Sequence, residues 1–124
     1  MPGRILFVED NPQNRYLVTF LLEKSGYEVE VALDGEQALE VIEAMSPPPQ
    51  LILMDMQLPK MDGYEATRRI KADDRFHHIP LVALTAHSMK GDRGKAIDAG
   101  CDEYVTKPVD ADGLVALIAR LIGE

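Results

Sequence analysis

The sequence predicts an α/β domain, a doubly wound five-stranded parallel sheet in the order 2-1-3-4-5 with helices on both faces. Short apolar runs alternate with helical periodicity along the whole chain, which is typical of parallel strands joined by helical crossovers. Four of the five runs end in a polar or charged residue, as in sheets that carry ligands at the carboxyl ends of their strands. The length of 124 residues suits one domain, residues 1–124.

The first predicted strand and helix occupy residues 5–26. Residues 5–8 are apolar throughout, as in a strand buried on both faces. Asn11 is a favoured helix cap, and Pro12 suits the first helical position because no helical hydrogen bond is lost there. Gly26 predicts the end of the helix. Apolar residues at helical spacing predict its inward face, which consists of Leu17, Val18, Leu21 and Leu22.

Two further strands are predicted before the middle of the chain. Residues 27–32 alternate apolar and acidic side chains, so this strand should lie at an edge of the sheet. Asp34 and Gln37 form a capping box that starts the second helix. Residues 51–55 carry four apolar residues and then Asp55, which predicts a buried strand ending in a carboxylate.

The second half of the chain continues the alternation. Predicted helices span residues 63–72, 88–100 and 110–122, and predicted strands span residues 81–84 and 103–106. These two strands end at Thr85 and Lys107. Gly91 and Gly94 each weaken the helix at 88–100 by about 1 kcal/mol relative to alanine, so we expect it to be the least rigid helix.

The strand order is inferred from the strand ends. Strand two ends without a polar residue, so it is placed at the edge of the sheet beside strand one. The order 2-1-3-4-5 then gathers the other four ends around the switch point between strands one and three. The polar residues at these ends are Glu9, Asp10, Asp55, Thr85 and Lys107.

Composition limits the possible partners. The chain has 13 Lys plus Arg against 21 Asp plus Glu, a formal charge of −8, and no basic stripe, so nucleic acid and anionic membranes are poor partners. The lone Cys101 fits a reducing compartment. The N-terminal apolar run is too short for a signal peptide core or a bilayer span. We therefore expect a cytoplasmic protein with no nucleic-acid partner and no membrane partner.

The predicted site is acidic and rich in oxygen ligands. Glu9, Asp10 and Asp55 would repel one another unless a cation or protons intervene. Lys107 supplies one positive charge, and a site of this kind suits Mg²⁺. A carboxylate can also attack phosphorus to give an aspartyl phosphate, with a metal, Lys107 and the Thr85 hydroxyl around the phosphoryl oxygens.

Other interpretations stay open on the residues alone. Asp55 could be a turn residue, Thr85 a helix cap and Lys107 plain surface, although four such residues at four strand ends are hard to dismiss together. A phosphatase or phosphotransferase with an aspartyl-phosphate intermediate would want a second carboxylate where Gln57 stands. A dinucleotide-binding domain would want a glycine-rich turn at residues 9–12, where none occurs.

Four motifs occur in order at residues 5–11 (ILFVEDN), 53–63 (LMDMQLP with MDG), 84–86 (LTA) and 104–108 (YVTKP). With them, the chain from Arg4 to Leu121 resembles the receiver domain of two-component response regulators. It is similar to stand-alone receivers of the DivK type and equally to receivers attached to hybrid histidine kinases. The resemblance implies the flavodoxin-like receiver fold and a phosphorylation-controlled signalling switch. It implies no enzyme beyond self-phosphorylation and slow self-dephosphorylation.

The resemblance assigns the chemistry residue by residue. Asp55 would accept a phosphoryl group from a phosphohistidine in a Mg²⁺-dependent reaction. Asp10, Asp55 and the backbone carbonyl of Gln57 would hold the Mg²⁺, and Glu9 would act directly or through water. Lys107 would hold a phosphoryl oxygen.

The resemblance also implies a switch and partners. Thr85 would move its hydroxyl onto the phosphate, Tyr104 would turn inward, and the bond before Pro108 is expected to be cis. A sensor histidine kinase or phosphotransfer protein would act upstream. A downstream protein would bind the face of the fourth helix, fifth strand and fifth helix, with the chain a monomer or weak dimer. We expect a single receiver domain without an output domain; a fragment of a hybrid kinase and a phosphorylation-independent docking module are the alternatives.

Overall fold

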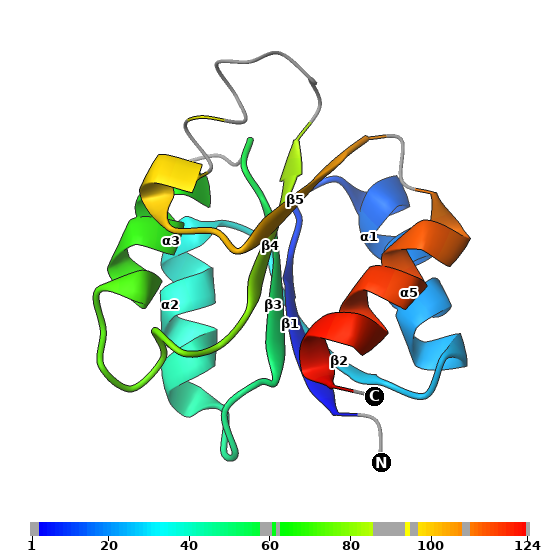
Figure 1. Cartoon of the computed structure of the whole chain (residues 1–124), viewed down its shortest axis with the longest axis horizontal. Coiled ribbons are helices and arrows are strands. Elements are labelled where there is room, and N and C mark those ends of the chain that lie inside the picture. Colours follow the sequence, from blue (N-terminus) through cyan, green and yellow to red (C-terminus); the bar gives the residue numbers. More distant parts are fainter. Residues whose placement is uncertain are drawn as a thin grey trace.

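The computed structural model describes residues 3–57, 61, 63–85, 94, 97–107 and 110–123. Its centre is a five-stranded, all-parallel sheet in the order β2-β1-β3-β4-β5, which confirms the predicted order (Figure 1). The strands are β1 (Arg4–Val8), β2 (Glu28–Ala32), β3 (Leu51–Asp55), β4 (Leu81–Thr85) and β5 (Glu103–Thr106).

Helices cover both faces of the sheet, as predicted. On one face lie α1 (Pro12–Lys24) and α5 (Ala111–Ile122), and on the other lie α2 (Gly35–Ala44) and α3 (Gly63–Lys71) (Figure 1). Within the predicted helix at 88–100, Gly94 and residues 97–99 are helical, whereas Gly91 lies outside the described residues. The low rigidity of that helix stays a prediction. Among the described residues, no helix combines the length and hydropathy needed to cross a bilayer.

The apolar strands pack against helices on both faces. All five residues of β3 are buried, as its unbroken apolar run predicts. Successive side chains of β1 and β3 enter opposite clusters because side-chain direction alternates along a strand. The cluster under α2 and α3 includes Leu6, Val8, Ile52, Met54, Ile42 and Ile70. The cluster under α1 and α5 includes Ile5, Phe7, Leu51, Leu53, Leu22 and Ile118.

Local hydrogen bonds begin two of the helices where the sequence predicts. Asn11 caps α1, its Oδ1 accepting the Asn14 N–H at 3.0 Å. Asp34 caps α2, its Oδ1 accepting the Gln37 N–H at 2.8 Å. The Gln37 side chain reaches one residue further back than a standard capping box, since its Oε1 accepts the N–H of Leu33 at 2.7 Å.

The edge strand β2 is polar on its outer positions, as its alternation predicts. Glu28 and Glu30 are exposed, and Arg4 of β1 pairs with their carboxylates at 3.3 and 3.4 Å. Charged side chains of this kind make an edge strand a poor template for pairing with another chain.

The amino ends of β4 and β5 are joined to α3 by one lysine. Lys71 Nζ donates to the carbonyls of His77 at 3.2 Å and Ile79 at 2.7 Å, and to the Asp102 carboxylate at 2.8 Å. The same Asp102 oxygen accepts the N–H of Leu81 at 2.8 Å. These four hydrogen bonds connect the three elements at the edge of the sheet opposite the strand ends that carry the predicted site.

The prediction for the inward face of α1 was partly wrong. Val18 and Leu22 are buried, but Leu17 is 63% exposed. At about 100° per residue, the four apolar positions cover an arc of roughly 140°, and contact with the sheet centres on the Val18 and Leu22 side. Leu17 therefore falls on the outer rim of the helix, where Tyr16 and Phe20 are exposed too.

The two leucines of α1 provide a matched test of this packing. We expect Leu22→Ala to lower the free energy of unfolding by about 2–5 kcal/mol, because it leaves a cavity in a fully buried site. Leu17→Ala should change it by less than about 0.5 kcal/mol. Urea denaturation of both variants would measure this, and equal destabilisation would contradict the assignment of the buried face.

Candidate functional site

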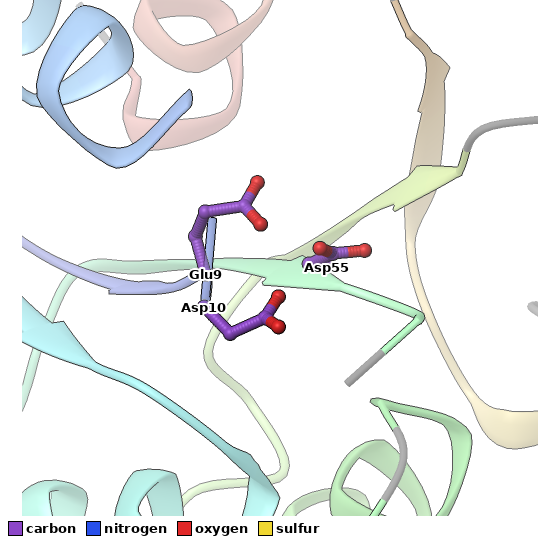
Figure 2. A group of neighbouring side chains, drawn as sticks. All are labelled: Glu9, Asp10 and Asp55. Atoms are coloured by element: carbon purple, nitrogen blue, oxygen red, sulfur yellow. The ribbon is translucent and has the colours of Figure 1, made fainter. Parts of the chain in front are cut away.

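The ends of β1 and β3 bring three carboxylates together. Glu9 and Asp10 directly follow β1, and Asp55 is the last residue of β3. These strands are neighbours at the centre of the sheet, so one oxygen from each of the three side chains lies within 4.8 Å of the others (Figure 2). Glu9 and Asp55 are buried, whereas Asp10 is exposed. The predicted convergence of the three acids is therefore present in the fold.

Backbone hydrogen bonds hold the strand ends in place beyond the regular ladder. The Glu9 N–H donates to the Ala32 carbonyl at 3.0 Å, and the Met56 N–H donates to the Leu84 carbonyl at 3.0 Å. The Lys107 N–H donates to the Thr85 carbonyl at 2.7 Å. Each functional strand end is thus tied to the strand beside it.

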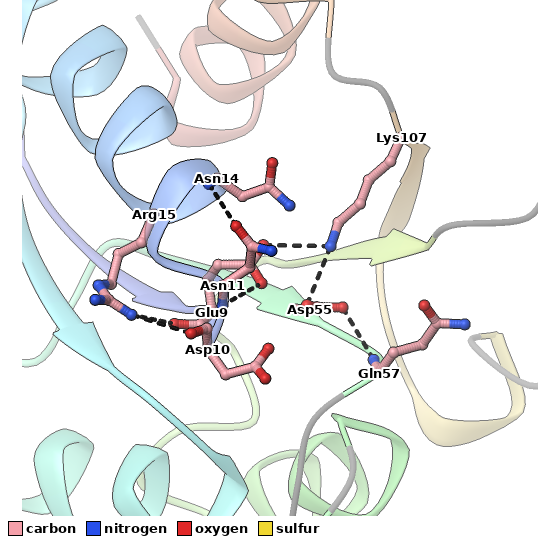
Figure 3. Close-up of polar contacts among 8 residues, drawn as sticks. All are labelled: Glu9, Asp10, Asn11, Asn14, Arg15, Asp55, Gln57 and Lys107. Atoms are coloured by element: carbon pink, nitrogen blue, oxygen red, sulfur yellow. Dashed lines mark hydrogen bonds and ion pairs between the residues drawn. The ribbon is translucent and has the colours of Figure 1, made fainter.

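Lys107 is the cation that faces this cluster. Its Nζ lies 3.1 Å from Asp55 Oδ2 and 3.3 Å from Glu9 Oε1 (Figure 3). Burial acts to lower the pKa of Lys107, but the charges of Asp55 and Glu9 outweigh it and raise the pKa above its ordinary value. One ammonium group is shared by two buried carboxylates, so negative charge is left over in the site.

Glu9 carries much of the remaining electrostatic cost. Burial, followed by a hydrogen bond to Asp55 and the charge of Asp55, raises its pKa from 4.5 to about 7, although Lys107 and the Asn11 N–H act in the opposite direction. Among the described residues, Glu9 Oε1 accepts no hydrogen bond, in spite of its proximity to Lys107. Glu9 Oε2 accepts the Asn11 N–H at 3.3 Å.

The two oxygens of Asp55 have different partners. Asp55 Oδ2 accepts a hydrogen bond from Lys107, and Asp55 Oδ1 accepts one from the backbone N–H of Gln57 at 2.9 Å. Both contacts fix the orientation of a carboxylate that is only 2% exposed. Gln57 therefore lies beside Asp55, as predicted, and the use of its carbonyl as a metal ligand stays a prediction.

The remaining predicted residues lie on β4 and β5 or beyond them. Thr85 is buried at the end of β4, next to the strand that carries Asp55. Tyr104 is half-buried on β5, opposite Ala83, and packs against the cluster under α2 and α3. Pro108 lies outside the described residues, so its cis bond stays a prediction.

Arg15 contributes to the site but was not predicted. Its guanidinium donates to the backbone carbonyls of Glu9 at 3.4 Å and Asp10 at 3.3 Å (Figure 3). Arg15, which lies near the start of α1, thereby fixes the acidic connection between β1 and α1. An arginine five residues after an acidic strand end is the sequence signal that would have suggested this contact.

The donor set suits a hard divalent cation. The converging side-chain groups are carboxylate oxygens, and Lys107 compensates only part of their charge. Mg²⁺ is bound by one or two carboxylates together with waters, so Asp10 and Asp55 would be sufficient as protein ligands. Glu9 Oε1, which is close to Lys107 but accepts no hydrogen bond among the described residues, could accept one from a ligated water.

Fold and site together define a small α/β domain with an acidic, lysine-bearing site at the switch point of its sheet. The chain belongs to the response regulator receiver domain family, whose sequence profile matches residues 5–119, and so to the receiver domains of two-component systems.

Known relatives agree in both sequence and fold. The chain is 40% identical to the polar-differentiation response regulator DivK of Brucella anthropi, over all of this chain and 99% of that protein. It is 39% identical to the receiver domain of the sensor histidine kinase PA1611 of Pseudomonas aeruginosa PAO1, over the full length of both chains, with a TM-score of 0.91. That structure has a magnesium ion coordinated in its active site cleft. A putative response regulator from Chloroflexus aurantiacus is 27% identical over both full chains, with a TM-score of 0.93.

The raised pKa of Glu9 predicts how the stability of the metal-free protein depends on pH. The folded chain holds the Glu9 proton more tightly than the unfolded chain, so this group's stabilisation is complete below pH 4.5 and is lost as the pH rises to about 7. The free energy of unfolding in EDTA should therefore fall across this window. Glu9→Gln cannot titrate and is the control; an unchanged pH dependence in that variant would contradict the assignment.

Proposed function

We propose that this protein is a phosphorylation-controlled signalling switch. Asp55 accepts a phosphoryl group from a phosphohistidine on a sensor histidine kinase or phosphotransfer protein. The observation that carries the proposal is the environment of Asp55: a buried carboxylate oriented by Lys107 and the Gln57 N–H, beside the carboxylates of Glu9 and Asp10. Membership of the receiver family supports the same role.

The transfer needs few groups from the protein. An oxygen of Asp55 attacks phosphorus, an O–P bond forms, the P–N bond to the histidine breaks, and the electron pair stays on the imidazole nitrogen. Lys107 stabilises the charge on a phosphoryl oxygen, and Thr85 donates its hydroxyl to another. Asp10, Asp55 and the Gln57 carbonyl would hold a Mg²⁺ ion, with Glu9 acting directly or through water, and the bound ion would supply further charge neutralisation.

Gln57 favours a switch over an enzyme that acts on external substrates. A phosphotransferase of the aspartyl-phosphate kind needs a general acid two residues after the nucleophile, and a glutamine cannot donate or accept the proton. Slow loss of the phosphate by attack of water on phosphorus is then the only turnover that we propose. We therefore infer self-phosphorylation and self-dephosphorylation without further catalysis.

The output is a change in binding. Phosphorylation adds about −1.5 to −2 charges at one point and shifts an existing equilibrium by as much as the active state binds the phosphate better. Thr85 and Tyr104 are the switch residues, and a downstream protein binds the face of the fourth helix, β5 and α5.

We place the protein in the cytoplasm as a single receiver domain, residues 1–124, that acts as a monomer or weak dimer. A receiver cut from a hybrid histidine kinase would use the same chemistry.

The exposed side chains of α1 support an approach of the phosphodonor along this helix. Tyr16, Leu17 and Phe20 are 74%, 63% and 55% exposed. Helix α1 begins two residues after Asp10, so these apolar side chains lie on the helix that starts at the site which the donor's phosphohistidine has to reach. Tyr16 and Phe20 also line an open groove of about 410 Å³ against Val31 of β2.

Intact mass after incubation with acetyl phosphate tests the chemistry. We expect one added phosphoryl group per chain in the presence of Mg²⁺ and none in EDTA. Asp55→Asn should take up none, because the amide is not a nucleophile. Lys107→Ala should slow uptake about 100-fold or more, as removal of one preorganised charge-stabilising donor does elsewhere. Full phosphorylation of Asp55→Asn would refute the assignment of the acceptor.

The α1 surface can be tested separately from the chemistry. Tyr16→Ala combined with Phe20→Ala should lower the rate of transfer from a phosphorylated sensor kinase by about tenfold, since buried aromatic contacts dominate protein interfaces. The same variant should react with acetyl phosphate at the wild-type rate. Equal rates with the protein donor would show that the phosphodonor does not use this part of α1.

A further inference from the structure

Two glycines contact the segment that follows Asp55. The described residues of this segment are Met56, Gln57 and Met61. Gly63, the first residue of α3, donates its N–H to the Met56 carbonyl at 3.3 Å. Gly35, the first residue of α2, donates its N–H to the Met61 carbonyl at 3.2 Å. Helices α2 and α3 thus each touch the segment with a residue that has no side chain.

Space, and not backbone conformation, requires a glycine at position 63. Gly63 is outside the left-handed region. A Cβ there would lie 2.6 Å from the Met56 Cα and closer still to the Asp55 carbonyl oxygen. Real Cβ contacts essentially never fall below 3.0 Å, and both atoms belong to the backbone, so neither can rotate away. A side chain at 63 would displace the end of β3 itself.

Gly35 approaches the same segment from the start of α2. It follows β2, the one strand that supplies no predicted site residue. A Cβ there would lie 2.9 Å from both the Cβ and the Cγ of Met61, and nearer still to the Met61 carbonyl oxygen. The Met61 backbone would have to move to admit even a methyl group. The two glycines therefore limit the position of the segment at both ends, and Gln57 lies between these two contacts.

We propose that Gly35 and Gly63 are positioning residues for the phosphoacceptor site. They seat the segment against the N-termini of α2 and α3, so that the Gln57 N–H meets Asp55 Oδ1 at 2.9 Å and the Gln57 carbonyl is available to Mg²⁺. This inference rests on the proposed function. Met56 is tied to both Leu84 and Gly63, so a displacement that starts at Met61 is taken up between Met56 and Met61, the stretch that contains Gln57.

Gly35→Ala is the test variant, and Gly113→Ala is its matched control. Gly113 also lies in the first turn of a helix, but a Cβ there would meet only the Asp110 carboxylate, at 2.7 Å, which can rotate away. Both changes bring the same gain in helix propensity. We expect Gly35→Ala to weaken Mg²⁺ binding about tenfold, in the range known for residues that orient metal ligands, and Gly113→Ala to leave it unchanged.

Calorimetric Mg²⁺ titration gives the dissociation constants, and thermal unfolding gives the stability of each variant. The rate of phosphorylation of Gly35→Ala by acetyl phosphate should return to the wild-type rate at saturating Mg²⁺. A weaker Mg²⁺ affinity with a normal rate at saturation would not result from general destabilisation. Equal Mg²⁺ affinity in the wild type and both variants would overturn the positioning role and leave the proposed function intact. A wild type that takes up no phosphate would overturn both.

A measurement on the wild type covers the case in which Gly35→Ala does not fold. Mg²⁺ should slow hydrogen exchange at the amides of Gly35 and Gly63, although neither is a ligand, because coupling between two sites is reciprocal. Protection that rises at Gln57 but not at Gly35 would overturn the proposal.

Discussion

Two buried carboxylates share one ammonium group at the carboxyl edge of this sheet, and the rest of the structure depends on that arrangement. Glu9 and Asp55 lie at the ends of adjacent central strands, and Lys107 reaches them from the carboxyl end of β5. The strands are buried on both faces, so the acids cannot separate to relieve their repulsion. The fold thus maintains an excess of negative charge at the place where we propose that a cation and a phosphoryl group bind.

The position of the acids could be predicted because it follows from short-range patterns. Apolar runs that end in polar residues define the strands, and a parallel topology places all their ends at one edge. The order of the strands required only one further inference. Because β2 ends without a polar residue that could join the site, it was placed at the edge of the sheet. Glu9, Asp10, Asp55 and Lys107 were therefore assembled correctly from the sequence.

Other features depend on contacts between residues far apart in the chain. Leu17 belongs to an apolar stripe that is wider than the contact made by α1, and only the packed structure shows which rim is exposed. Arg15, by contrast, binds two backbone carbonyls only five and six residues away, so the spacing of an arginine after the acidic strand end was the one available signal, and it was missed. The close approach of Gly35 to Met61 joins α2 to a segment 26 residues later, and a glycine before a helix is also an ordinary helix start.

The two edges of the sheet differ in how completely their polar groups are satisfied. At the amino edge, Lys71 and Asp102 tie α3 to β4 and β5 through four hydrogen bonds. At the carboxyl edge, Glu9 has to share the Lys107 ammonium with Asp55, and among the described residues its Oε1 accepts no hydrogen bond. Partial unfolding of the native protein should therefore begin at the functional end, while the amino edge stays closed as part of the last cooperative unit to open. A change in the position of the functional end would then leave the amino edge, and with it the fold, in place.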